Sequence, residues 1–88
     1  MYVIIAYDVA VGRVNKVKKF LRTQLVWVQN SLFEGELTDS RYMEIKQTVS
    51  KIINPEIDCL TIYKFQSNKA MERENLGISK GDPEDVVL

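Results

Sequence analysis

The chain has no histidine and a single cysteine, Cys59, among its 88 residues. Without imidazole it can form neither a Ser-His nucleophile nor a histidine base, and one thiol cannot form an intramolecular disulfide or begin a cysteine-based zinc site. Metal chemistry based on oxygen ligands remains, of the kind that binds magnesium. We therefore expect any metal site in this chain to be built from carboxylates.

An excess of positive charge is also missing, since twelve Lys and Arg side chains balance twelve Asp and Glu side chains. Any surface that attracts nucleic acid must therefore be local. No apolar run approaches the roughly 18 residues that a membrane span needs, and the N-terminus lacks the pattern of a signal peptide. We expect a cytoplasmic protein with no membrane contact.

The length of 88 residues allows one domain. Area scaling predicts that such a chain buries only about two thirds of its unfolded surface, so that a monomer would be marginally stable. A homodimer would add the buried area that a single copy lacks.

The first segment, residues 2–7, is rich in β-branched and aromatic residues and predicts a central strand buried on both faces. Asp8 would lie at the C-terminal tip of this strand. Gly12 would let the chain turn into a helix over residues 13–24, with an apolar arc and a basic arc. The apolar arc holds Val14, Val17, Phe20 and Leu21, and the basic arc holds Lys16, Lys18, Lys19 and Arg22.

The middle of the chain predicts extended structure over residues 26–37, as two strands joined near Asn30 or as one long bent strand. Gly35 would allow a bulge or a bend. Good N-cap residues at 38–40 then begin a second helix that stops at Asn54-Pro55. Residues 59–65 predict a last strand, and residues 66–75 a short helix or a loop.

Strand, helix, extended pair, helix and strand is the order of the α+β, ferredoxin-like βαββαβ unit, with two helices on one face of an antiparallel sheet. We assign this domain to residues 1–78. Its uncovered face would pair with a second copy across a two-fold axis. Residues 79–88 form a tail that would add a short extra strand at the edge of the partner's sheet. The predicted interface residues are Phe33, Val86, Val87 and Leu88.

Three stretches together resemble the CRISPR-associated Cas two family. They are the strand ending in Tyr7-Asp8-Val9, the basic helix after it, and Val28–Gly35 followed by Leu37-Thr38. Together with the end of the second helix at Asn54-Pro55 and the strand from Leu60 to Tyr63 that follows, their order and spacing cover residues 1 to about 65 and make the match specific.

The resemblance implies a ferredoxin-like homodimer in which Asp8 meets its two-fold mate and binds magnesium, or manganese. Members are described as metal-dependent endonucleases on single-stranded RNA or duplex DNA. They also bridge two dimers of the spacer-acquisition integrase and hold a duplex between them. Asp8 would then be both the catalytic residue and the metal ligand.

Two features depart from the family pattern. Trp27 stands where the family often has a basic residue, so one phosphate contact is missing. The basic residues after Asp8 are arranged a little differently from the family's arginines, so the resemblance assigns neither Arg13 nor Lys16 to a particular one of them. We predict nucleic-acid binding by Arg13, Lys16, Lys18, Lys19 and Arg22.

A single carboxylate is a poor magnesium site, because the ion needs six oxygens and takes one or two carboxylates from the protein. Two facing copies of Asp8 would supply the second carboxylate, and the cation would relieve their repulsion. The alternative for Asp8 is a turn or cap residue. For the basic arc the alternative is a solvated helix face, as it is for Arg41, Lys46 and Lys51 of the second helix.

Other polar and aromatic residues have simpler explanations. We expect Asp58, Glu34 and Glu36 to be solvated charges rather than ligands, and Cys59 to be a small core residue. The aromatic side chains would pack in the core and the dimer interface rather than stack on bases. They are Tyr7, Trp27, Phe33 and Tyr63.

Two functions fit this chain. One is a weak magnesium-dependent phosphodiesterase that uses Asp8 from each subunit, and the other is a scaffold that binds duplex DNA and integrase without cleavage. A related toxin-type ribonuclease with the same fold is a third possibility, which the neighbouring genes would decide.

Overall fold

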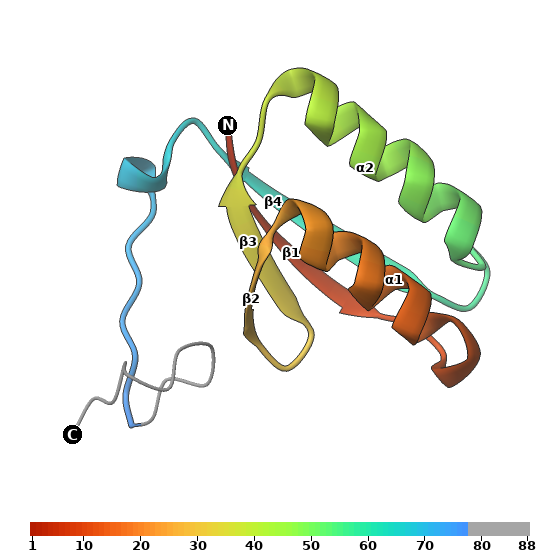
Figure 1. Cartoon of the computed structure of the whole chain (residues 1–88). Helices are drawn as coiled ribbons and strands as arrows, with labels where there is room; N and C mark the ends of the chain where they lie inside the picture. The colour runs from red at the N-terminus through yellow and green to blue at the C-terminus, as the bar shows by residue number, and fades with distance from the viewer. Residues whose placement is uncertain (78–88) are drawn as a thin grey trace.

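The elements follow the predicted order of strands and helices. The structure, a computed structural model, describes residues 1–77. They form β1 (Tyr2–Asp8), α1 (Val11–Gln24), β2 (Val26–Gln29), β3 (Leu32–Glu36), α2 (Asp39–Ile52) and β4 (Cys59–Phe65), as Figure 1 shows. The strands make one antiparallel sheet in the order β2-β3-β1-β4. The ferredoxin-like prediction is confirmed.

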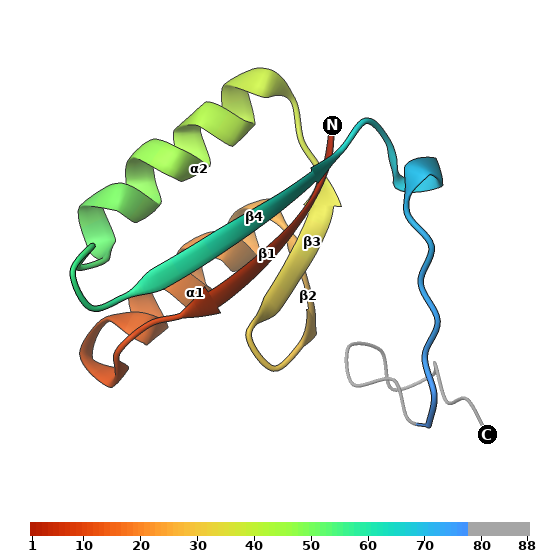
Figure 2. The ribbon, with the colours of Figure 1, turned by 180° about the vertical axis from the view of Figure 1, so that it is seen from behind.

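Both helices cover the same face of the sheet. In β1 the side chains of Val3, Ile5 and Tyr7 are buried, and the residues between them are more exposed, because successive side chains of a strand point to opposite faces. The buried set packs against α1 and α2. Figure 2 shows the other face of the sheet with no helix in front of it; we call it the open face. The core consists of Val3, Ile5, Tyr7, Val17, Leu21, Leu25, Phe33, Leu37, Ile45 and Val49.

The extended segment after α1 is a hairpin of two strands, which decides between the two predicted alternatives. Asn30 has a φ of 40°, a left-handed conformation that asparagine tolerates well in tight turns. The bulge lies in β2 between Trp27 and Gln29, not at Gly35 as predicted. A Cβ atom at Gly35 would lie only 3.0 Å from the Leu25 side chain, so this glycine allows close packing instead.

The helix boundaries follow their capping residues. The Thr38 side chain accepts a hydrogen bond from the Arg41 N–H and begins α2, which ends just before Asn54-Pro55. Helix α1 begins at Val11, two residues earlier than predicted, so Gly12 lies in its first turn rather than in a turn before it. Neither helix of the part that the structure describes is long and apolar enough to cross a membrane.

After β4 the chain forms one short 3-10 turn, Asn68–Ala70, and then an extended segment. The Arg73 guanidinium makes an ion pair with Glu34 of β3, and the Tyr2 hydroxyl donates a hydrogen bond to the same carboxylate. These contacts hold the segment at one end of the open face. The predicted edge strand, with Val86, Val87 and Leu88, lies outside the described residues.

The prediction that Phe33 lies in a dimer interface is wrong. Its side chain is 0% exposed within the single chain, and its ring centroid lies 5.9 Å from that of Tyr7. The register pairs Phe33 with Ile5, which places both under the helices. Phe33 is therefore a residue of the subunit's own core.

Replacing Phe33 by Ala should lower the free energy of unfolding by about 3–5 kcal/mol, because the substitution leaves a cavity in the core. Urea denaturation at one protein concentration measures this loss. Met43→Ala on the outer side of α2, where the side chain is 48% exposed, is the control and should cost much less. Equal losses in the two variants would contradict the core assignment.

Candidate metal and nucleic-acid site

Asp8 is the last residue of β1, and its side chain is exposed. The strand alternation places it on the open face with Ile4 and Ala6, and its cross-strand partner is Cys59, the first residue of β4. Among residues 1–77 no hydrogen bond or ion pair occupies the Asp8 carboxylate. It is therefore available to a ligand at one end of the open face.

The donor set around Asp8 decides whether magnesium fits. A carboxylate is a hard oxygen ligand of the kind that magnesium prefers. Glu34 lies on the same face, but its partner in the register is Ile4, four residues and roughly 13 Å from Asp8 along the strand. No group of three potential metal ligands occurs in the described part of one chain. A single copy thus provides the right type of ligand but too few of them.

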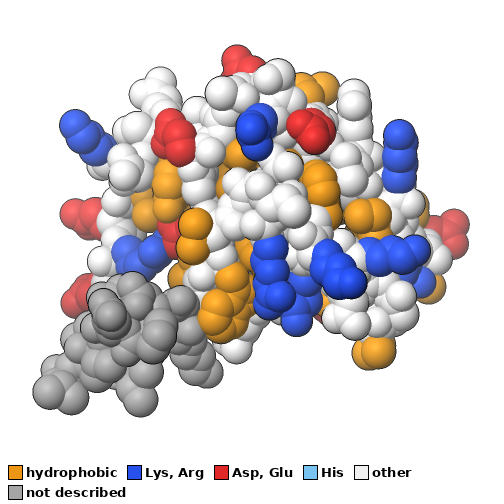
Figure 3. Space-filling view, viewed as in Figure 1, with side chains coloured by type: hydrophobic (Ala, Val, Ile, Leu, Met, Phe, Trp, Pro, Cys, Tyr) orange, Lys and Arg blue, Asp and Glu red, His pale blue; other side chains and the backbone are white. Residues whose placement is uncertain are grey.

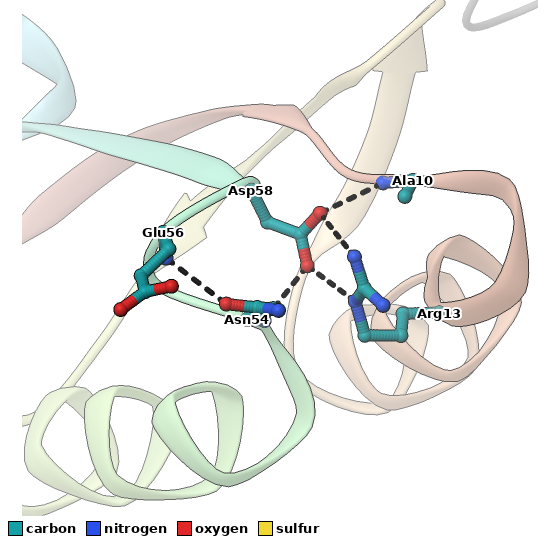
Figure 4. A network of polar contacts seen from close by, with 5 residues as sticks. All are labelled: Ala10, Arg13, Asn54, Glu56 and Asp58. Carbon is teal, nitrogen blue, oxygen red and sulfur yellow. Dashed lines mark hydrogen bonds and ion pairs between the residues drawn. The ribbon is translucent and has the colours of Figure 1, made fainter.

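A second carboxylate, that of Asp58, precedes Cys59, the residue of β4 that pairs with Asp8. All of its hydrogen bonds are made within the subunit. Its side chain is 0% exposed and accepts four hydrogen bonds, as Figure 4 shows. Oδ1 accepts from the Ala10 N–H at 3.0 Å and from Arg13 Nη2 at 2.9 Å. Oδ2 accepts from Arg13 Nε at 2.5 Å and from the Asn54 N–H at 2.8 Å. We call this network the Asp58 clasp.

The Asp58 clasp corrects two predictions. Asp58 is buried rather than solvated, and the Arg13 hydrogen bond holds the pKa of its carboxyl well below the usual range. The same bond raises the pKa of Arg13. Because both guanidinium contacts of Arg13 go to Asp58, Arg13 is occupied within the subunit and is not the free phosphate-binding residue predicted for it.

The basic arc of α1 is present on the surface. Lys16, Lys19 and Arg22 are exposed, and Lys18 is half-buried. Figure 3 shows Lys and Arg side chains gathered over α1 on the face that carries the helices. By strand alternation Asp8 lies on the open face, whereas this basic surface lies on the side of the sheet that the helices cover.

Comparison with known proteins places these features in a family. The sequence model of CRISPR associated protein Cas2 matches residues 1–73. The chain belongs to the Cas2 family. It is 51% identical over 88 residues to "CRISPR-associated endoribonuclease Cas2" of Methanothermobacter thermautotrophicus, covering 100% of this chain and 96% of that protein. It is 57% identical over 81 residues to "CRISPR-associated endoribonuclease Cas2 2" of Archaeoglobus fulgidus, covering 92% and 88%.

Solved Cas2 structures show the same fold. One described as "Crystal structure of cas2" superposes with a TM-score of 0.86 at 41% identity, covering 99% of this chain and 98% of that chain. Streptococcus pyogenes Cas2 superposes with a TM-score of 0.77 at 30% identity, covering 88% and 100%. The resemblance stated from the sequence motifs is confirmed.

In this Cas2-family chain, two other predictions are wrong. Cys59 is exposed rather than a core residue. Glu34 is buried rather than solvated, and burial of the Tyr2 side chain beside it, together with their hydrogen bond, raises the pKa of Tyr2 to about 12. The Glu36 side chain is exposed, as predicted. The sequence carried no sign of the Asp58 clasp, since Asp58 and Arg13 are 45 residues apart.

Asp58 should give the fold a pH dependence that Asp58→Asn lacks. The folded-state pKa of Asp58 is lowered, so its stabilising effect is complete above about pH 5 and is lost as the pH falls below the unfolded-state value of about 4. The difference in unfolding free energy between wild type and Asp58→Asn should therefore shrink as the pH falls from about 5 to about 3. Urea denaturation curves of both proteins at several pH values in this range measure the difference. A difference that stays constant with pH would contradict this assignment.

Proposed function

We propose that this Cas2-family protein acts on nucleic acid as a homodimer, with an Asp8 carboxylate from each subunit at a shared magnesium site. The observation that carries the proposal is the placement of Asp8: exposed, without a partner among the described residues, and on the face of the sheet that no helix covers. The names of the curated relatives, CRISPR-associated endoribonucleases, support a nuclease activity on RNA.

The open face has the character of an interface. Ile4, Tyr63 and Phe65 line a groove of about 570 Å³ together with residues 70–75, and Tyr63 is 54% exposed. A small domain that leaves such side chains uncovered gains stability by burying them against a second copy. Pairing across a two-fold axis would also bring equivalent residues near the axis together, Asp8 with Asp8.

The chemistry follows from the residues that one dimer would contribute. Two Asp8 carboxylates repel each other, and a divalent cation between them removes that repulsion. Magnesium, or manganese, would supply Lewis acidity at a phosphate and a bound water of lowered pKa. Asp8 would hold and orient the ion, while the basic arc of α1 binds phosphates by charge. Neither task requires histidine.

A second candidate function is a scaffold that binds duplex DNA and bridges two dimers of the spacer-acquisition integrase. The small number of potential metal ligands favours this function. No group of three occurs within residues 1–77, and a second ion has no evident ligands there. Weak cleavage and a mainly structural role are compatible. The CRISPR-associated names of the relatives support either role over a toxin-type ribonuclease.

Asp8→Asn should abolish magnesium-dependent cleavage of single-stranded RNA and duplex DNA, because the variant loses the anionic ligand while keeping the shape of the side chain. Labelled substrates are incubated with magnesium or EDTA at matched dimer content, and Asp39→Asn in α2 serves as a control that loses an equal charge elsewhere. Cleavage that persists in Asp8→Asn would refute the assignment. No cleavage by wild type, with duplex binding retained, would favour the scaffold.

The basic arc should show itself in the salt dependence of duplex binding. Combined replacement of Lys16, Lys19 and Arg22 by Gln removes up to three phosphate contacts, which lowers the slope of log K against log salt by up to about 2.7. Fluorescence anisotropy between about 50 and about 200 mM salt measures the slope.

The matched control removes the same charge from the neighbouring helix, by combined replacement of Arg41, Lys46 and Lys51 by Gln. This variant should keep the wild-type slope. If both triple variants lose the same slope, binding is a response to overall charge and α1 is not the contact surface.

A further inference from the structure

The turn from Asp8 into α1 is stabilised by a residue from another part of the chain, Asp58. Ala10 is the N-cap residue of α1, and its methyl side chain offers no capping hydrogen bond. In a capping box, a Glu at the third helical position accepts a hydrogen bond from the N–H of the N-cap residue. Here that third position is Arg13, and Asp58 of the α2–β4 turn accepts from the Ala10 N–H instead. Arg13 in turn holds Asp58.

Asp58 is itself fixed on its other side. Its N–H donates to the Asn54 carbonyl at 2.7 Å, and its Oδ2 accepts from the Asn54 N–H at 2.8 Å. The next residue, Cys59, begins β4 and is the cross-strand partner of Asp8. The backbone around Asp8 is therefore fixed at two points, by pairing with Cys59 and by the bond to Ala10, and Asp58 adjoins both.

We propose that Asp58 and Arg13 are positioning residues for the Asp8 carboxylate. The proposal rests on the proposed function of Asp8 as a metal ligand, and it assigns the Asp58 clasp a role in that function beyond the stability of the fold. The clasp sets the path of residues 8–10 and thereby the direction of the Asp8 side chain. It acts through the backbone, since neither residue contacts the Asp8 carboxylate.

The geometry distinguishes the Asp58–Arg13 pair from an ordinary surface ion pair. The Asp58 side chain is 0% exposed and that of Arg13 is 30% exposed, so the charges hold each other in a setting largely shielded from water. Both Arg13 bonds and the Ala10 bond end on one rigid carboxylate. Groups that hydrogen-bond a metal ligand directly change metal affinity by about 10–100-fold when they are replaced, and the clasp, which acts through the backbone, should have an effect near the lower end of this range.

The test measures Mn²⁺ binding by the electron paramagnetic resonance signal of the free ion, in the full-length protein. Asp58→Asn should weaken Mn²⁺ binding about tenfold or more. Arg13→Lys keeps the Asp58–Ala10 bond but replaces the two guanidinium hydrogen bonds to Asp58 by a single ammonium contact. It should therefore also weaken Mn²⁺ binding, but less than Asp58→Asn does. Ile45→Val destabilises the core of α2 without touching the clasp, and it should bind Mn²⁺ like the wild type.

Amide hydrogen exchange provides a readout that needs no metal. In Asp58→Asn and Arg13→Lys the amide of Ala10 should exchange faster than in wild type, because it donates to Asp58, while those in the middle of β1 change no more than in Ile45→Val. Mn²⁺ binding unchanged in both clasp variants would overturn the proposal. So would unchanged exchange at Ala10.

The two failures are distinguishable. If wild type and Asp8→Asn bind Mn²⁺ equally, the proposed function of Asp8 fails, and the metal-positioning role falls with it whatever the clasp variants do. If only Asp8→Asn weakens binding, Asp8 is the ligand and the clasp does not position it. Arg13→Lys decides the matter should Asp58→Asn fail to fold.

Discussion

The one-sided cover of the sheet is the constraint on which the function of this chain depends. Both helices pack on the face that carries Val3, Ile5 and Tyr7, and strand alternation then puts Asp8 on the other face. That face keeps exposed apolar side chains and one free carboxylate at its end. In the proposed function, pairing two copies of this domain would bury the open face and bring the two Asp8 carboxylates together.

The two buried carboxylates of the described residues, Glu34 and Asp58, lie toward opposite ends of the sheet. At one end, Glu34 binds Tyr2 and Arg73 and holds the segment that follows β4. At the other end, the Asp58 clasp holds the turn after Asp8. Buried carboxylates are stable only when they are well paired, so each of these charges fixes the backbone that brings its partners. The carboxylate of Asp8 remains free at the end of the open face beside the clasp.

The sequence predicted the features that local rules control. The order of the elements follows from apolar periodicity and capping residues, and the position of Asp8 follows from the end of an apolar strand. It did not predict which face Phe33 takes, because the register with Ile5 decides this and a bulge in β2 breaks the alternation along the hairpin. Apart from the nearby Asn54, the partners of Asp58 and Glu34 were also beyond reach, since they come from segments more than thirty residues away. Burial of these carboxylates depends on those partners.

The central claim, that two copies complete the site at Asp8, is tested most directly by the dimer dissociation constant with magnesium and with EDTA. Sedimentation equilibrium of wild type and Asp8→Asn provides the four values. The account predicts that magnesium tightens the wild-type dimer, and that Asp8→Asn dimerises equally well with and without the ion, because no carboxylates face each other in the variant. The same magnesium effect in both proteins, or none in either, would contradict it.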